Sequence, residues 1–200
     1  MSDPCNYRLV LAGPGEDIKK LARTAIGFKS PDSWKASRKP VKLPLSFVAL
    51  YNSLPTTARK RLPLKEREPY DLTSESLVTE KNGNRHKSYS FMLSLYDPQL
   101  LLIEVSKIFP RVCFVLGWVA PHADEAGSEL IRKGTAKRYN MSGKRRSEIR
   151  ASKYKEWGED CWEADLEANW LMLDEVVVRW DTNLAKIFKS AKRQGRKRPR

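Results

Sequence analysis

The sequence is poor in the residue types that most often form cross-links, bind metals or carry out catalysis. It has three cysteines, Cys5, Cys113 and Cys161, and only two histidines, His86 and His122. The cysteines are odd in number and far apart, so they form neither a disulfide framework nor a CxxC metal or redox motif. This usage fits a reducing compartment, and no pattern in the sequence predicts a cofactor.

Long apolar runs are also missing. No stretch approaches the roughly 20 apolar residues that cross a bilayer, and residues 1–8 are neither basic nor apolar as a secretory signal would be. We therefore predict a cytoplasmic protein that does not contact membranes. The phosphate-binding patterns GxxxxGKS/T and GxGxxG are absent as well, and Glu16 and Asp17 would repel a phosphate from the turn at 13–15.

Apolar and aromatic residues, in contrast, are sufficient for a packed core. Of the 200 residues 40% are hydrophobic, and these include six Trp, seven Tyr and six Phe. The length and composition suit one compact domain with appendages. We find no internal repeat.

The charges are sorted by sign along the chain. The formal net charge is +14. Residues 132–155 contain ten bases and the single acid Glu148, residues 156–175 contain eight acids and no base, and residues 186–200 contain eight bases and no acid. Such blocks create a field that another molecule can respond to. A basic chain with this distribution favours an anionic partner, and nucleic acid is the commonest one.

Four apolar runs predict the strands of one sheet. They lie at 7–12, 45–51, 89–95 and 112–119, and the last is apolar enough to be central in its sheet.

Two helices are predicted between these strands. Glu16 and Asp17 favour the start of the first, which stops near Gly27, and Asp97 and Pro98 begin the second. The order strand, helix, strand, strand, helix, strand predicts an α+β fold of the ferredoxin-like βαββαβ type, an antiparallel sheet with both helices on one face.

The other segments are expected to decorate this core, which spans 3–139. Residues 56–84 are predicted to be a long polar insertion with little regular structure, ending in a tight turn at Asn82 and Gly83. A helical extension is predicted at 140–190 and a disordered basic tail at 191–200.

A hairpin before the extension and helices within it are also predicted. Residues 129–139, with Lys133 and Gly134 at the middle, predict a hairpin, and 142–157 predict a basic helix or loop. A last short helix is predicted from Leu184, Ile187 and Phe188. An amphipathic helix is predicted from apolar residues that recur at steps of three and four: Trp162, Leu166, Trp170, Leu173 and Val177.

Several turn motifs resemble those of YubB-like proteins. The segments that carry the likeness are the strand that stops at Gly13, the proline turn at 44–55, the helix with a Phe-Pro end at 102–110, and 117–127 followed by Gly134. The likeness covers about 3–139 outside the insertion. The chain departs from the family at 89–96, which contain no tryptophan. The resemblance implies a ferredoxin-like domain found on bacterial plasmids and phages, and it implies no established activity.

Two clusters of polar residues are candidates for a catalytic or metal site. His122, Asp124 and Glu125 follow a strand, where active sites often lie, but acid–base or metal chemistry would need more convergent groups. The carboxylates of Asp160, Glu163 and Glu167 share a helical face, without the histidine of a di-iron motif. A solvated loop and a solvated acidic face are the plainer interpretations. We predict no catalytic residue, no metal ligand and no small-molecule substrate, with a metal-dependent hydrolase as the alternative.

The leading hypothesis is a non-enzymatic accessory protein of a plasmid or phage that binds DNA or RNA through its carboxyl-terminal third. Tyr139, Tyr154 and Trp157 are interleaved with the bases and would stack on exposed nucleobases. The hypothesis requires that the acids at 156–175 do not cover the bases. The residues predicted to contact phosphate are Arg132, Lys133, Lys137, Arg138, Lys144, Arg145, Arg146, Arg150, Lys153, Lys192, Arg193, Arg196, Lys197 and Arg198.

A second hypothesis is a protein-binding module, either a delivered effector or an inhibitor of a host or competing-element protein. It depends on the acidic, tryptophan-bearing segment 156–180, because Trp is enriched in interface hot spots. The basic end also resembles the arginine-rich ends of proteins exported by conjugation-type secretion machines.

Overall fold

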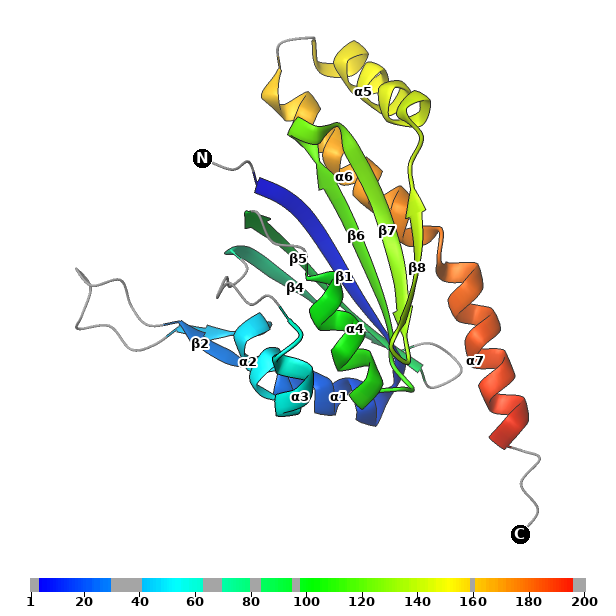
Figure 1. Ribbon diagram of the computed structural model, residues 1–200. Helices are drawn as coiled ribbons and strands as arrows, with labels where there is room; N and C mark the ends of the chain where they lie inside the picture. The colour runs from blue at the N-terminus through cyan, green and yellow to red at the C-terminus, as the bar shows by residue number, and fades with distance from the viewer. Residues whose placement is uncertain are drawn as a thin grey trace.

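A computed structural model describes residues 4–29, 41–62, 70–79, 84–94, 98–158 and 161–195. Six antiparallel strands form its main sheet, in the order β4-β5-β1-β6-β7-β8 (Figure 1). This sheet, with helices against it, confirms the predicted α+β class. The strands are β1 (Pro4–Pro14), β4 (Tyr70–Thr79), β5 (Asn84–Ser94), β6 (Cys113–Ala120), β7 (Glu125–Arg132) and β8 (Thr135–Asn140).

The alternation of side chains along β1 supplies two cores. Leu9 and Leu11 point to one face of the sheet and belong to the first core, whereas Ala12 belongs to the second core on the opposite face. Strand β1 pairs with β5 on one side and β6 on the other. Gly13 ends the strand beside the backbone of Arg111, where a Cβ would lie 2.9 Å from the carbonyl oxygen.

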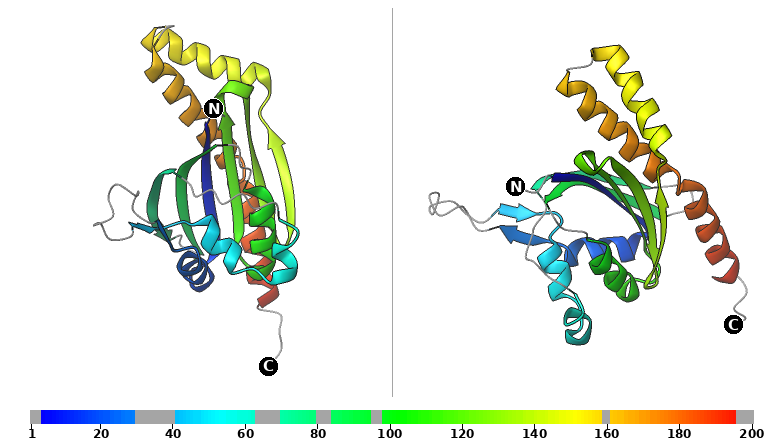
Figure 2. Two further views of the ribbon diagram at one scale, coloured as in Figure 1. Left: turned by 60° about the vertical axis from the view of Figure 1, so that its left-hand side comes forward. Right: turned by 45° about the horizontal axis from the view of Figure 1, so that its top comes forward.

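Helices α1 (Gly15–Thr24) and α4 (Gln99–Ile108) cover the first face, as Figures 1 and 2 show. Ile18 and Leu21 of α1, with Leu102 and Val105 of α4, are buried in the first core. The predicted starts of both helices lie within a few residues of the observed ones. Helix α4 is less buried than its composition indicates, because Leu100 is exposed.

The second predicted strand, 45–51, is wrong. Its residues form α2 (Phe47–Asn52), which begins at the N-cap Ser46, whose hydroxyl oxygen accepts a hydrogen bond from the amide of Ala49 at 3.0 Å. Phe47 and Leu50 are buried three residues apart on one face of this short helix.

The predicted irregular insertion contains regular structure instead. It holds the short helix α3 (Thr56–Arg59) and the whole of strand β4, which pairs with β5. The predicted turn at Asn82 and Gly83 lies outside the described residues. Two more short strands, β2 (Gly27–Lys29) and β3 (Val41–Leu43), pair in a separate small sheet.

Strands β7 and β8 form the hairpin predicted at 129–139. Lys133 and Gly134 connect them with positive φ angles of 52° and 80°, as a two-residue turn between right-twisted strands requires. A short 3₁₀ turn, η2 (Pro121–Ala123), joins β6 to β7.

Three helices complete the chain: α5 (Gly143–Trp157), α6 (Trp162–Val178) and α7 (Asp181–Gly195). Helix α6 lies across the second face of the sheet and contacts β1, β6 and β7. Its Met172, Leu173 and Val176 are buried there. The predicted extension therefore supplies nine of the fourteen buried residues of the second core. Helix α7 continues to Gly195, so the first five residues of the predicted disordered tail, 191–195, are helical.

None of the helices in the described part of the chain combines the length and the apolar composition needed to cross a membrane.

Candidate nucleic-acid interface

The basic residues predicted to contact nucleic acid fall into three groups. Arg132, Lys133, Lys137 and Arg138 lie in the β7–β8 hairpin, and Lys144, Arg145, Arg146, Arg150 and Lys153 lie on α5. Lys192 and Arg193 lie in the last turns of α7, and Arg196, Lys197 and Arg198 lie outside the described residues. Figure 1 shows α5 and the end of α7 at opposite ends of the molecule.

Helix α5 is attached to the rest of the protein mainly through polar contacts. Its amino end is capped by Ser142, whose hydroxyl oxygen accepts a hydrogen bond from the amide of Arg145 at 3.3 Å. Ile149 is the buried residue of this 15-residue helix. A helix with so little apolar contact depends on its ion pairs for its position.

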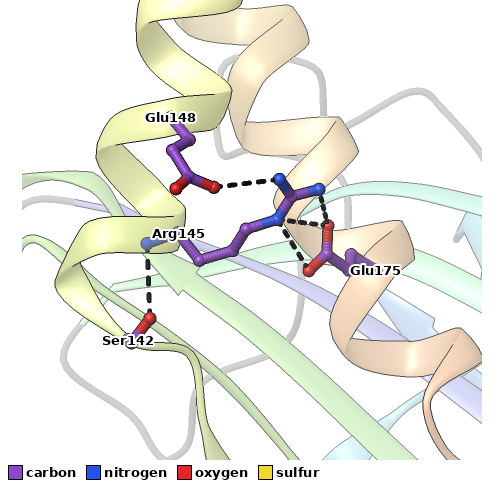
Figure 3. Close-up of polar contacts among 4 residues, drawn as sticks. All are labelled: Ser142, Arg145, Glu148 and Glu175. Atoms are coloured by element: carbon purple, nitrogen blue, oxygen red, sulfur yellow. Dashed lines mark hydrogen bonds and ion pairs between the residues drawn. The ribbon is translucent and has the colours of Figure 1, made fainter.

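Arg145 joins α5 to α6 (Figure 3). Its Nε donates to both carboxylate oxygens of Glu175 at 3.1 Å, and its Nη2 donates to Oε2 at 2.8 Å. Its Nη1 donates to Glu148 on α5 at 3.2 Å. The contacts with Glu175, and then those with Glu148, raise the pKa of Arg145 above its ordinary value. Both sides of this guanidinium therefore face carboxylates.

Arg146 and Arg150 share one carboxylate, that of Asp124. Arg146 Nη2 lies 3.2 Å from Asp124 Oδ2, and Arg150 Nη1 lies 2.6 Å from Oδ1. Hydrogen bonds from Arg146, and secondarily from Arg150, lower the pKa of Asp124. Asp124 has a φ of 47° in the loop that the sequence offered as a catalytic candidate. In the structure this carboxylate fixes the start of α5.

Lys153 and Tyr154 attach the other end of α5 to α6. Lys153 Nζ lies 2.7 Å from Glu156 and 2.8 Å from Glu167, and the Tyr154 hydroxyl donates to Asp165 at 2.5 Å. The lysine lowers the pKa of Glu167. Four of the predicted phosphate contacts on α5 are thus already paired with carboxylates, while Lys144 is exposed.

Of the acids at 156–175, Glu175 pairs with an arginine of α5, as the sequence allowed, and Glu159 lies outside the described residues. The other carboxylates that contact the three arginines are those of Asp124 and Glu148. Exposed pairs of this kind contribute only ~0–1 kcal/mol each. They nevertheless leave α5 with much less free positive charge than its sequence indicates.

The hairpin presents its bases in two ways. Arg138 Nε lies 2.8 Å from a carboxylate oxygen of Glu129, and its guanidinium lies 4.8 Å from the ring centroid of Trp118. Lys137 and Lys133 are exposed. Arg138 also lines a pocket of about 320 Å³ at the end of the sheet, whose other lining residues are Trp118, Glu125, Ala126, Asn140, Met141 and Arg146.

Helix α7 carries the last basic block. Trp180 and Leu184 anchor its first turns in the second core, each with 3% of its surface exposed. Lys186 follows and is exposed. Asp181 is the last acidic residue of the chain, so the eight bases of 186–200 have no acid among them. The phosphate contacts predicted from the sequence include Lys192 and Arg193 but not Lys186 and Lys189. These two lysines belong to the same basic block and recur with its other bases on α7 at steps of three and four residues.

Metal chemistry finds no support among the described residues, which contain no group of three or more His, Cys, Asp and Glu residues able to hold an ion. The side chain of His122 and the residue Asp160 lie outside what the structure describes.

Comparison of the chain with models of known protein families, with curated proteins and with solved structures finds no match. The site is therefore interpreted from its own geometry and charge.

Proposed function

We propose that the protein binds nucleic acid without catalysing a reaction, and that the principal contact is made by 186–200. The observation that carries the proposal is the position of the last acid. After Asp181 the sequence has eight bases and no further Asp or Glu, and α7 leads from the second core toward the end of the molecule opposite α5 (Figure 1).

The ion pairs of α5 make it the secondary surface. A phosphate group that contacts Arg145 or Arg150 must displace a carboxylate, whereas one that contacts Lys186 need not compete with an acid on the same segment. Counterions released by lysine and arginine contacts favour binding without reading the base sequence. We therefore expect weak sequence selectivity.

Salt dependence gives a quantitative test. If about five phosphates are contacted, the logarithm of the binding constant should fall with the logarithm of salt concentration with a slope of about −4.5 for duplex DNA and about −3.5 for single strands. Gel shifts with both DNA forms at several salt concentrations measure this slope.

Charge-matched variants locate the contact. The triple variant Lys189→Gln, Lys192→Gln and Arg193→Gln should weaken binding by roughly tenfold or more and make the slope shallower by about 3. The matched control, Lys19→Gln, Lys20→Gln and Arg23→Gln, removes the same charge from the exposed side of α1 and should change binding much less. Equal losses in the two variants would show that only net charge matters and would refute the proposed interface.

We further infer that the sheet is of the ferredoxin-like type and that the chain is an accessory protein of a plasmid or phage related to YubB-like proteins. Support for the fold comes from the unit β1-α1-β4-β5-α4-β6, which follows the βαββαβ order along the chain. Its strands lie side by side in the order β4-β5-β1-β6, so the first and third strands are central. The strand that sequence reasoning placed at 45–51 is replaced in this unit by β4. Genes for conjugation or replication beside this one would support the relationship.

A protein-binding role is the second candidate. The observation that favours it is the exposure of Trp157 and Trp162, since large apolar side chains on a surface commonly mark an interaction site.

A further inference from the structure

The end of the α5–α6 hairpin that lies farthest from the sheet exposes large apolar side chains. Trp162 is 68% exposed, Trp157 is 47% exposed and Leu166 is 42% exposed. They belong to the hairpin tip, here residues 156–158 and 161–167, which projects past the end of the sheet (Figures 1 and 2).

Sequence periodicity placed Trp162 and Leu166 on the same stripe as Leu173. That prediction is wrong for Trp162, Leu166 and Trp170, which are exposed. The buried face of this part of α6 is formed by Ala164, Ala168 and Met172 instead.

The charge of the tip limits what can cover these side chains. The described residues of the tip contain four acids, Glu156, Glu163, Asp165 and Glu167, and no base. Glu156 and Glu167 share Lys153, while Asp165 accepts its hydrogen bond from the neutral hydroxyl of Tyr154. Nucleic acid and an anionic bilayer would both be repelled by the remaining negative charge. The partner that fits is a cationic protein segment.

Two contacts within the protein show how it holds a guanidinium against an indole. Arg8 lies 5.8 Å from the ring centroid of Trp170 and forms an ion pair with Asp174, one turn farther along α6. Arg138 likewise stacks on Trp118 and pairs with Glu129. In both cases an arginine lies over a tryptophan and is held by a carboxylate, which combines cation–π attraction with an ion pair.

The hairpin tip presents the same two groups on its surface. Asp165 lies three residues after Trp162, on the same side of α6, and the indole of Trp157 donates a hydrogen bond to the carboxylate of Glu167. An arginine-rich segment could therefore bind the tip with the chemistry that Arg8 already uses on α6.

The chain itself contains such a segment at 193–200, where five of eight residues are arginine or lysine beyond any acid. We propose that this segment of a second copy of the protein binds the hairpin tip.

The segment of the same copy cannot reach its own tip. Helix α6 has 17 residues and α7 has 15, so they are about 25 Å and 22 Å long. They lead from the tip to the opposite end of the molecule (Figure 1). The five residues after Gly195 span at most about 18 Å, which is less than the length of α7 alone.

This contact joins two different surfaces, so it is heterologous. Each copy keeps a free tip at one end and a free basic segment at the other, and association should continue head to tail as concentration rises. Nucleic acid bound to 186–200 would compete for the same segment and shorten the assemblies.

Sedimentation velocity of the full chain, free of nucleic acid, tests the proposal at low and high salt. The wild-type protein should form species that grow with concentration at low salt and dissociate at high salt. The tip variant, Trp162→Ala with Glu163→Lys, and the segment variant, Arg193→Gln with Arg196→Gln and Arg198→Gln, should each associate at least about tenfold more weakly. The control Val178→Ser alters an exposed apolar residue of α6 outside the tip and should associate as wild type does.

Mixing the two defective variants separates this interface from any other. The tip variant still supplies a basic segment and the segment variant still supplies a tip, so an equimolar mixture should form a dimer and no larger species. A wild-type protein that stays monomeric at low salt, a mixture that stays monomeric, or association lost in the tip variant alone would each overturn the proposal. The inference does not depend on nucleic-acid binding, because the tip variant should retain the gel shift of the wild type.

Discussion

Gly117 shows how the absence of one side chain fixes the position of a helix. A Cβ at this position of β6 would lie 2.7 Å from Val177 Cγ2 and 3.2 Å from Leu173 Cδ1, both on α6. Because α6 packs directly on the glycine, Gly117→Ala should lower the free energy of unfolding by about 1–3 kcal/mol, as overpacked cores do. Urea denaturation followed by fluorescence measures the change.

Gly143 provides the matched control. It lies in the first turn of α5, and the nearest atom to its added Cβ is Arg146 Nη2 at 3.5 Å, an ordinary van der Waals distance. Gly143→Ala should leave stability unchanged or raise it by up to ~1 kcal/mol. Equal losses at both positions would show that α6 does not pack against the sheet as described.

Ser128 is a buried hydroxyl that joins β7 to the end of α6. It donates to the carbonyl oxygen of Val176 at 2.6 Å and accepts from the indole nitrogen of Trp180 at 2.8 Å. Ser128→Ala leaves the indole N–H buried without this acceptor, so we expect a loss of about 1–3 kcal/mol in the free energy of unfolding. Ser147→Ala on the exposed side of α5 should change it by less than about 0.5 kcal/mol. If Ser128→Ala leaves the free energy of unfolding unchanged, water must reach the indole N–H.

At the scale of the elements, α5 is the helix most sensitive to pH. Arg146 and Arg150 lower the pKa of Asp124 from its usual 3.8, and Lys153 lowers that of Glu167 from 4.5. A carboxylate whose pKa is lower in the folded state stabilises the fold above its unfolded pKa. That stabilisation is lost as the pH falls through the folded pKa. The docking of α5 should therefore be constant near neutral pH and should weaken below about pH 4.

Hydrogen–deuterium exchange can follow this release. The amides of α5 should lose protection at acid pH before those of β6, which lies in the middle of the sheet. Asp124→Asn keeps a residue that tolerates the positive φ but removes the charge, so α5 should exchange faster already at neutral pH. Loss of protection in α5 and β6 at the same pH would contradict electrostatic docking.

The elements differ in how clearly their sequences specify them. The starts of α1 and α4 and the β7–β8 hairpin could be predicted, because acids, proline and a Lys-Gly turn act locally. The segment 45–51 could not be identified by apolar content alone, since a short buried helix and a buried strand have the same composition. The missed signal was Ser46 as an N-cap, with Phe47, Leu50 and Leu54 at helical spacing. Strand β4 was missed because its polar sequence depends on pairing with β5.

At the scale of the whole molecule, charge blocks in the sequence do not translate directly into charged surfaces. The acids at 156–175 were weighed as a cover for neighbouring bases, and Glu156, Glu167 and Glu175 do pair with α5. Asp124, far away in sequence, completes the set, and only the fold could bring it to Arg146 and Arg150. The basic segments could thus be located from the sequence, whereas the structure shows that four bases of α5 are paired with carboxylates.

The buried residues at the start of α7 predict where the folded domain ends. Trp180 and Leu184 are buried in the second core, while 189–200 follow the last partly buried side chain that the structure describes, Phe188. A chain that ends at Phe188 keeps every buried residue that the structure describes, so it should keep the stability of the full protein within about 0.5 kcal/mol. A chain that ends at Arg179 loses a buried tryptophan and a buried leucine, which should cost at least ~3–5 kcal/mol. Denaturation of the two truncated proteins tests this directly. If the basic segment only binds partners, the Phe188 chain should fold normally, bind DNA much more weakly than the full protein and fail to self-associate. A large loss of stability in that chain would instead make 189–200 part of the folded core.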